Sequence, residues 1–137
     1  HDFPAGTYYV GDLCYVLHEV WDEFCDLTIK DNDCLDGIFT LADGRRFATF
    51  QTAWGDGEYQ DQYGNRYGVD AGLIGVISAH DIDWEYPGNF SGGGNVVEFT
   101  EPFSVGASKG LIVIGHFKID TDPQDFDYRE NIEDIED

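Results

Sequence analysis

The sequence predicts a mainly β domain, either an antiparallel β-sandwich or a curved sheet with one short helix packed across it. Short runs of β-favouring residues recur along the chain, with glycine-containing turns between them. Two of these runs, 73–78 and 111–114, are apolar at successive positions, which is typical of strands covered on both faces. A chain of 137 residues, of which 42% are hydrophobic, is long and apolar enough to form one folded domain.

The N-terminal part contains the predicted helix. Residues 6–17 are predicted to form a strand pair, or one long strand that is interrupted at Gly11-Asp12. In residues 18–27, apolar side chains recur at helical spacing and acidic side chains occupy the other side. This segment is the one convincing amphipathic helix of the sequence.

Three hairpins are predicted after the helix, each from two β-favouring runs that flank a turn sequence. The paired segments are 38–41 with 47–51 across Asp43-Gly44, 58–63 with 66–70 across Gly64-Asn65, and 96–105 with 111–119 across 106–110. Between the second and third hairpins, 85–95 carries the triplet Gly92-Gly93-Gly94 and is predicted to be a flexible surface loop.

Charge is the most unusual property of the chain, because 28 acidic and 7 basic residues give a formal net charge of -21. Such a field repels nucleic acids and anionic membranes, and it attracts basic proteins and cations. Residues 120–137 contain 9 acidic residues and 1 basic residue, so we expect a β-rich domain over 1–119 and an acidic C-terminal tail. A basic protein is the expected partner. The same charge also keeps a small protein in solution without any partner.

The cysteines indicate a reducing compartment. Cys14, Cys25 and Cys34 cannot all pair within one chain, and they form no C-x-x-C motif. The first residues lack the basic and apolar regions of a signal peptide, and no apolar run approaches the length of a membrane span. We therefore expect a cytoplasmic protein with three free thiols.

Several segments resemble a family of uncharacterised small proteins from bacteria and their phages. They are Gly11-Asp12-Leu13-Cys14-Tyr15-Val16-Leu17, Trp21-Asp22-Glu23-Phe24-Cys25, Gly55-Asp56-Gly57-Glu58-Tyr59 and Tyr67-Gly68-Val69-Asp70-Ala71-Gly72-Leu73-Ile74-Gly75. The resemblance covers residues 5–119 approximately. It implies a β-rich phage-type protein in the cytosol of a bacterial host, and it supplies no catalytic residue.

Two groups of residues have ligand types suited to a metal but the wrong spacing, so no metal and no cofactor are expected. Cys14, His18, Cys25 and Cys34 are ligand types for zinc, but their spacing lacks the paired knuckle that positions two thiolates at once. The acidic run that begins at Asp31 fails the EF-hand pattern and is predicted to be a polar turn.

No catalytic arrangement stands out, and we predict that the protein is not an enzyme. The best cluster combines Ser78, His80, Asp81 and Asp83, with His116 on a neighbouring strand as an optional member. Adjacent residues of a strand point to opposite faces, so His80 and Asp81 cannot easily act on one substrate atom.

Aromatic and acidic residues in two loop regions are the predicted binding residues, because aromatic side chains near loops often anchor interfaces. They are Trp54, Asp56, Glu58, Tyr59, Asp61, Trp84, Glu85 and Tyr86. The favoured function is a non-enzymatic acidic binding protein that engages a basic site on a host protein, for example as a nucleic-acid mimic that inhibits its target. The alternatives are a phage structural or assembly component, and a small-ligand or metal-binding module.

Overall fold

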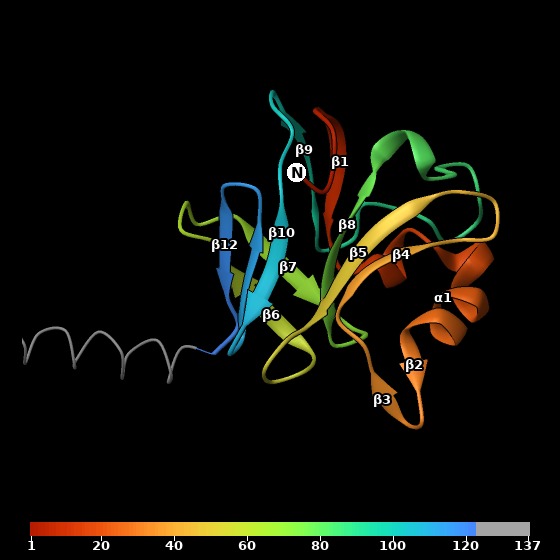
Figure 1. Cartoon of the computed structure of the whole chain (residues 1–137), viewed down its shortest axis with the longest axis horizontal. Coiled ribbons are helices and arrows are strands. Elements are labelled where there is room, and N and C mark those ends of the chain that lie inside the picture. Colours follow the sequence, from red (N-terminus) through yellow and green to blue (C-terminus); the bar gives the residue numbers. More distant parts are fainter. Residues whose placement is uncertain (123–137) are drawn as a thin grey trace, which may run out of the picture.

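The computed structural model describes residues 1–122, and an antiparallel five-stranded sheet forms its centre (Figure 1). The strand order across this sheet is β4–β5–β8–β1–β9. Its strands are β1 (Gly6–Gly11), β4 (Gly37–Thr40), β5 (Arg46–Gln51), β8 (Leu73–Ser78) and β9 (Asn95–Phe99).

Smaller elements cover the two faces of this sheet (Figure 1). One face packs against a three-stranded sheet and a hairpin, which are β10 (Val105–Ser108), β11 (Leu111–Ile114), β12 (Phe117–Asp120), β6 (Gly57–Gln60) and β7 (Arg66–Val69). The helical elements are α1 (Trp21–Thr28) and the 3₁₀ helices η1 (Leu13–Tyr15), η2 (His18–Val20) and η3 (Ala79–Asp81). The other hairpin follows α1 and consists of β2 (Ile29–Lys30) and β3 (Asp33–Cys34). The sheets are antiparallel and none is closed, so the predicted β-rich class with one short helix is confirmed.

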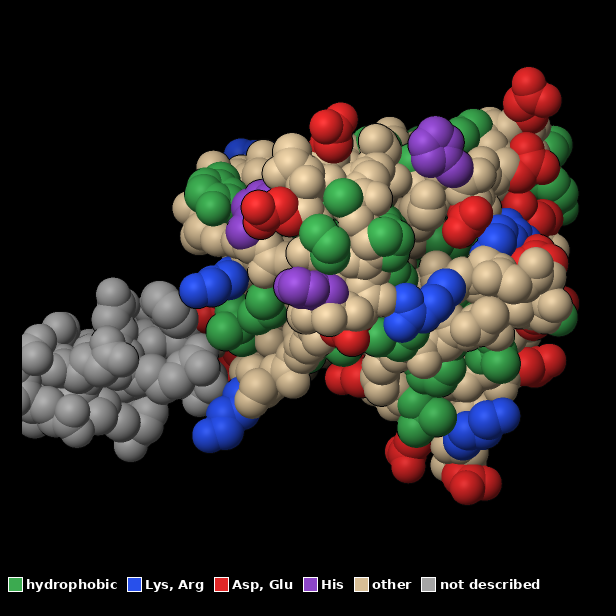
Figure 2. All heavy atoms as spheres, turned by 45° about the horizontal axis from the view of Figure 1, so that its top comes forward, with side chains coloured by type: hydrophobic (Ala, Val, Ile, Leu, Met, Phe, Trp, Pro, Cys, Tyr) green, Lys and Arg blue, Asp and Glu red, His purple; other side chains and the backbone are tan. Residues whose placement is uncertain are grey.

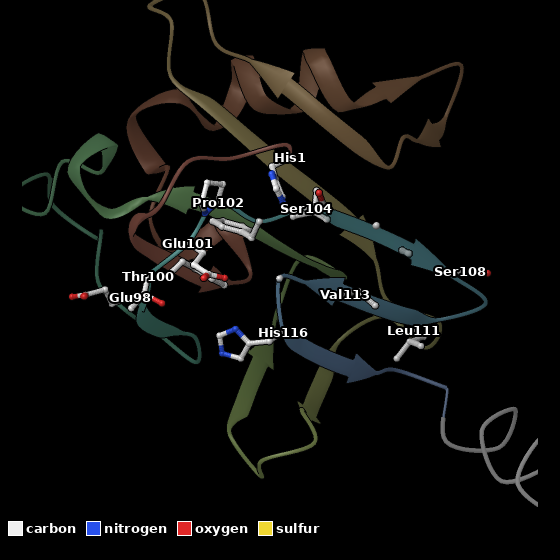
Figure 3. Close-up of a pocket in the computed structure, with 16 residues that line it drawn as sticks. His1, Glu98, Thr100, Glu101, Pro102, Ser104, Ser108, Leu111, Val113 and His116 are labelled. Carbon is white, nitrogen blue, oxygen red and sulfur yellow. The ribbon is translucent and has the colours of Figure 1, made fainter.

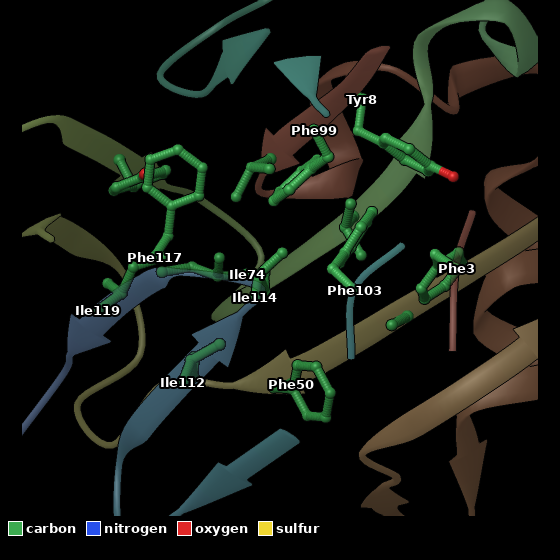
Figure 4. Close-up of a cluster of buried hydrophobic side chains, with 14 of the residues drawn as sticks. Phe3, Tyr8, Phe50, Ile74, Phe99, Phe103, Ile112, Ile114, Phe117 and Ile119 are labelled. Carbon is green, nitrogen blue, oxygen red and sulfur yellow. The ribbon is translucent and has the colours of Figure 1, made fainter. Parts of the chain in front are cut away.

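Side chains of the large sheet alternate between two hydrophobic cores, as the period of a strand requires. Tyr8 and Val10 of β1 face the small sheet, whereas Tyr9 between them faces the side of α1. The core against the small sheet, which we call the sandwich core, also contains the aromatic group of Phe99 and Phe103 (Figure 4). The second core, which we call the helix core, forms around Phe24 and Phe47, whose rings stack 5.0 Å apart.

Two predicted hairpins and one predicted central strand are confirmed. β4 pairs with β5 across Asp43-Gly44, and β6 pairs with β7 across a loop that contains Gly64. β8 lies between β5 and β1, and residues 74–77 are buried. These elements could be predicted because turn-forming residues and apolar patterns within short segments specify them.

The last predicted hairpin is right only in that β10 pairs with β11, and the bounds of both predicted strands are wrong. Residues 96–105 do not form one strand, because β9 ends at Phe99 and pairs with β1, while β10 begins at Val105 in the other sheet. The segment 111–119 turns at Gly115 and His116 and so forms two strands, β11 and β12. The expectation that β11 is covered on both faces is also wrong, since Leu111 and Val113 are half-buried.

The N-terminal segment differs from the predicted strand pair. β1 ends at Gly11, and a 3₁₀ helix follows because the buried carboxylate of Asp12 accepts a hydrogen bond from the backbone N–H of Cys14 (2.9 Å). The same carboxylate accepts the backbone N–H groups of Asp70 (2.9 Å) and Ala71 (2.6 Å). Asp12 thereby joins the segment after β1 to the turn before β8. The α-helix begins at Trp21, after a 3₁₀ turn over the first residues of the predicted helix.

The glycine triplet packs closely against the body of the domain, which corrects the expectation of a loose surface loop. The backbone N–H of Gly68 donates to the carbonyl of Gly93 over 2.9 Å. A Cβ on Gly92 would collide with the ring of Tyr15, and a Cβ on Gly94 would collide with the hydroxyl of Tyr9. Glycine is required here because the chain passes directly over other groups.

The end of the described chain is tied to the body. Thr121 is buried, and its backbone N–H donates to the carbonyl of Gly110 (2.8 Å) while its Oγ1 accepts the N–H of Ala53 (2.9 Å). Most of the predicted acidic tail, 123–137, lies outside the described residues. Across residues 1–122, no helix combines the length and the apolar character that crossing a bilayer would require.

Candidate protein-binding surface

The predicted binding residues fall into two sets at opposite ends of β8. The backbone N–H of Thr52 donates to the carbonyl of Gly72, which places the loop of Trp54 before the first residue of β8. The indole N–H of Trp84 donates to the carbonyl of Ala79, directly after the last residue of β8. A six-residue strand is about 20 Å long. The two sets therefore do not form one site.

The set before β8 lies in the loop between β5 and β6 and in β6 itself. Trp54 is 64% exposed, and its indole N–H donates to Asp122 over 3.3 Å. Glu58 forms an exposed ion pair with Arg66 at 3.5 Å, and Asp56 is exposed. Tyr59 is half-buried, and its hydroxyl donates to the carbonyl of Gly55.

Asp61 is buried and holds the β6–β7 loop together, so it is not available to a partner. Its carboxylate accepts hydrogen bonds from the N–H groups of Tyr63 and Asn65, the side-chain amide of Asn65 and the hydroxyl of Tyr67. Burial alone would raise the pKa of Asp61, but the hydrogen bonds together lower it by more than burial raises it. The pKa of Asp61 therefore lies below its ordinary value. This residue is structural.

The set after β8 lies in one loop, residues 82–90, which we call the aromatic loop. Trp84 and Tyr86 are 41% and 40% exposed, and Phe90 is 57% exposed. Glu85 lies between the first two and is exposed, as is Asp83. The loop thus presents three aromatic rings and two carboxylates to solvent.

Buried Asn89 fixes the shape of the aromatic loop. Its side-chain carbonyl accepts the backbone N–H of His18 (3.0 Å), and its amide donates to Glu19 Oε1 (3.0 Å) and to the carbonyl of Asp83 (2.9 Å). One side chain therefore joins both ends of the loop to the segment before α1. A loop that is held in this way loses little conformational entropy when it binds.

Phe90 is part of this surface, although the sequence analysis did not single it out. Its backbone N–H donates to the carbonyl of Tyr15 (3.0 Å), and its ring contacts the ring of Tyr15 edge-on at 5.6 Å. The only sequence signal was an aromatic residue in a polar, glycine-rich segment. That signal says nothing about which residues lie beneath it.

Few carboxylates of the described chain are neutralised by ion pairs. Arg45 pairs with Glu19 and Asp43, Arg66 pairs with Glu58, and no ion pair within residues 1–122 includes Asp83 or Glu85. Acidic side chains stand among hydrophobic ones along the edge of the molecule opposite to the grey trace (Figure 2). The exposed carboxylates of Asp83 and Glu85 therefore keep their negative charge free of ion pairs within residues 1–122.

The catalytic candidates Ser78 and His116 belong to different sheets. Ser78 Oγ accepts the backbone N–H of His80 at the start of η3, and His116 lies in the turn between β11 and β12 of the other sheet. Burial, followed by a hydrogen bond to Asp12, raises the pKa of Cys14, and burial also raises the pKa of Cys25. These thiols stay protonated near neutral pH, which makes them weak nucleophiles and weak metal ligands. The described residues contain no cluster of three or more metal-ligating side chains.

A shallow groove of about 710 Å³ lies over β10, β11 and the segment that joins β9 to β10 (Figure 3). Leu111 and Val113 form part of its floor, while His1 and His116 stand at its sides (Figure 3). The groove explains why one face of β11 is only half-buried.

Comparisons with protein-family models, curated proteins and solved structures gave no match for this chain.

Proposed function

We propose that this protein is a non-enzymatic acidic binding protein whose aromatic loop engages a basic site on another protein. The observation that carries the proposal is a loop that is fixed by Asn89 and exposes Trp84, Tyr86 and Phe90 beside Asp83 and Glu85. One form of this function is mimicry of nucleic acid, in which carboxylates occupy the positions of phosphates in a groove lined by Lys and Arg.

Charge supports the choice of a basic partner. The net charge of -21 attracts cationic surfaces over a distance of about one Debye length, roughly 8 Å at physiological salt. Carboxylates such as those of Asp83 and Glu85 keep this attraction, because no ion pair within residues 1–122 neutralises them. Nucleic acids and anionic membranes are repelled by the same field.

The aromatic rings supply contact area, which charge alone does not provide. Trp and Tyr anchor many protein interfaces because they bury a large area and have few rotatable bonds. Arginine guanidinium groups also stack on such rings, and a neighbouring carboxylate strengthens this contact. Trp84 and Tyr86 with Glu85 between them are suited to an arginine-rich surface.

Binding of a labelled arginine-rich peptide, followed by fluorescence anisotropy over a series of salt concentrations, tests the proposal. We expect affinity to fall steeply as salt rises and a lysine-rich peptide of equal charge to bind more weakly. Trp84→Ala and Tyr86→Ala should each weaken binding of the arginine peptide about fivefold.

Trp54→Ala is the matched control, because Trp54 is an exposed tryptophan at the other end of β8. Equal losses for Trp54→Ala and Trp84→Ala would contradict the assignment of the aromatic loop. Salt-independent binding would contradict the charge mechanism and would favour a phage structural or assembly component that makes apolar contacts.

The three thiols are free, in agreement with the expected reducing compartment. A location in the cytoplasm of a bacterial host belongs to the proposal. So does the absence of enzymatic activity.

A further inference from the structure

β9 is an outer strand of the five-stranded sheet, since within residues 1–122 it pairs with β1 alone. Successive residues of an antiparallel strand direct their N–H and C=O groups to opposite sides. The backbone N–H of Thr52 donates to the carbonyl of Gly72, which sets this alternation at the start of β8. Carried through the registers of β5, β8, β1 and β9, the alternation directs the N–H and C=O groups of Val96 and Glu98 away from β1.

The side chains of these two residues are exposed as well. Val96 is 48% exposed, and within the described chain it is the one exposed large hydrophobic residue of the five-stranded sheet. Glu98 lies on the same face of β9 and is also exposed. Unpaired backbone groups beside an exposed apolar side chain form an edge to which another extended chain can pair.

Two other strand edges are less suited to such pairing. β4, at the opposite margin of the sheet, keeps the large side chains of Ile38 and Phe39 half-buried. On β10, the outer strand of the small sheet, the backbone N–H of Val105 already donates to the carboxylate of Asp2 over 2.9 Å. Of these three edges, β9 alone combines unpaired backbone groups with an exposed large hydrophobic side chain.

Charge determines which chain this edge would accept. Glu98 and Glu101 are exposed and lie at the end of the groove away from Ser108 (Figure 3). No ion pair within residues 1–122 includes either carboxylate. A second copy of the chain carries the same net charge of -21 and is repelled, whereas an extended segment that carries arginine is attracted.

We propose that a basic, extended segment of the partner adds to β9 as an extra strand and hydrogen-bonds to the backbone of Val96 and Glu98. Addition of a strand to an exposed sheet edge is a recurring mode of peptide recognition. Arginine suits the face of Val96 and Glu98, because its stem packs on apolar surface while its guanidinium binds a carboxylate. On the other face, apolar side chains would lie beside Val97 and Phe99 of the sandwich core. The inference rests on the proposed basic partner and adds the conformation of the segment that binds.

Two labelled peptides separate strand addition from attraction by charge alone. One alternates arginine with valine. The other alternates arginine with proline, so it has equal charge but lacks an N–H group at every second residue. By fluorescence anisotropy we expect the valine peptide to bind about tenfold more tightly. Equal affinities, or no binding of the valine peptide, would overturn the proposal.

Proline variants test the edge itself. Val96→Pro removes an outward N–H and leaves the pairing of β9 with β1 in place, so it should weaken the valine peptide about tenfold. Val96→Thr keeps the N–H and should leave the affinity nearly unchanged. Thr40→Pro is the matched control, because the same alternation directs the N–H of Thr40 away from β5 at the β4 edge. Equal losses for Val96→Pro and Thr40→Pro would overturn the assignment to β9.

Amide hydrogen exchange of the unaltered chain, followed by NMR, locates the added strand. The amides of Val96 and Glu98 should exchange rapidly in the free protein, whereas that of Val97, which is directed toward Tyr8, should be protected. Saturating valine peptide should slow exchange at Val96 and Glu98 about tenfold or more.

The exchange data also separate this inference from the proposed function. Slowing that is confined to the aromatic loop would keep the proposed function and overturn the added strand. Slowing at Val96 and Glu98 with unchanged binding by Trp84→Ala would support the added strand and contradict the role of the aromatic loop. Protection of Val96 and Glu98 before peptide is added, together with a dimer in sedimentation, would place a second copy at this edge and overturn the proposal.

Discussion

The two faces of the five-stranded sheet differ in how completely they are covered. On the face of the sandwich core, strands lie over strands, and Phe99 and Phe103 stack with ring centroids 3.8 Å apart (Figure 4). On the face of the helix core, the α-helix has eight residues, so it is about 12 Å long. Five strands spaced about 4.8 Å apart span about 19 Å.

This difference decides where the molecule has room for a ligand. A second sheet follows the twist of the first and fills the space between them with interleaved side chains. A short helix covers only part of the sheet. The remaining part of that face is filled only where large side chains lie beside the helix. On this face a cavity of about 360 Å³ lies between α1 and the first residues of β8.

The largest effect is expected from a charge in the sandwich core. Ile114 is 0% exposed, so Ile114→Asp would bury a carboxylate without a partner and should lower the free energy of unfolding by about 4 kcal/mol. Val113→Asp, one position away on the half-buried face of β11, should cost about 1–2 kcal/mol. Urea denaturation measures both. Equal losses would show that the two faces of β11 are covered alike.

An intermediate effect is expected at Asp61, whose partner Tyr67 belongs to the sandwich core. Asp61→Asn should lower the free energy of unfolding by about 1–3 kcal/mol at neutral pH, because an amide cannot accept all four hydrogen bonds. The folded-state pKa lies below the ordinary value of 3.8, so the wild type has this stabilisation above pH 3.8 and loses it as pH falls through the folded-state pKa. The difference between wild type and variant should therefore shrink in acid.

Exposed Asp56 supplies the control for this pH dependence. Denaturation of Asp56→Asn over the same pH series should show a small difference from wild type at every pH. If the difference in unfolding free energy between wild type and Asp61→Asn stayed constant from neutral pH to strong acid, the carboxylate charge would contribute nothing to the stability of this part of the sandwich core.

The smallest effects are expected in the helix core, and they should have opposite signs. Thr28→Val removes a satisfied hydroxyl and leaves the carbonyl of Phe24 without that hydrogen bond, so it should lower stability by about 1 kcal/mol. Thr49→Val removes an unsatisfied buried hydroxyl and should raise stability by about 0.5 kcal/mol. Thermal unfolding without ligand compares them. A loss of stability in Thr49→Val would indicate that its hydroxyl has a partner.

Features that depend on neighbouring residues could be predicted from the sequence alone. The Asp43-Gly44 turn and its flanking strands were predictable because turn type follows from local backbone preference. The burial of β8 was predictable because its residues are apolar on both faces. Trp84 and Tyr86 were predictable as exposed aromatic residues because they stand in a loop rich in turn-forming residues.

Only the tertiary structure decided which distant segments meet. Residues 96–105 were divided between two sheets because β9 pairs with β1, and no local pattern encodes that choice. Asp61 and Asp12 look like surface acids in the sequence, but backbone N–H groups draw both carboxylates inside. Asn89 fixes the aromatic loop through His18, 71 positions away. Hydrogen bonds and packing across such separations depend on the whole fold, and that is why residue spacing could not reveal them.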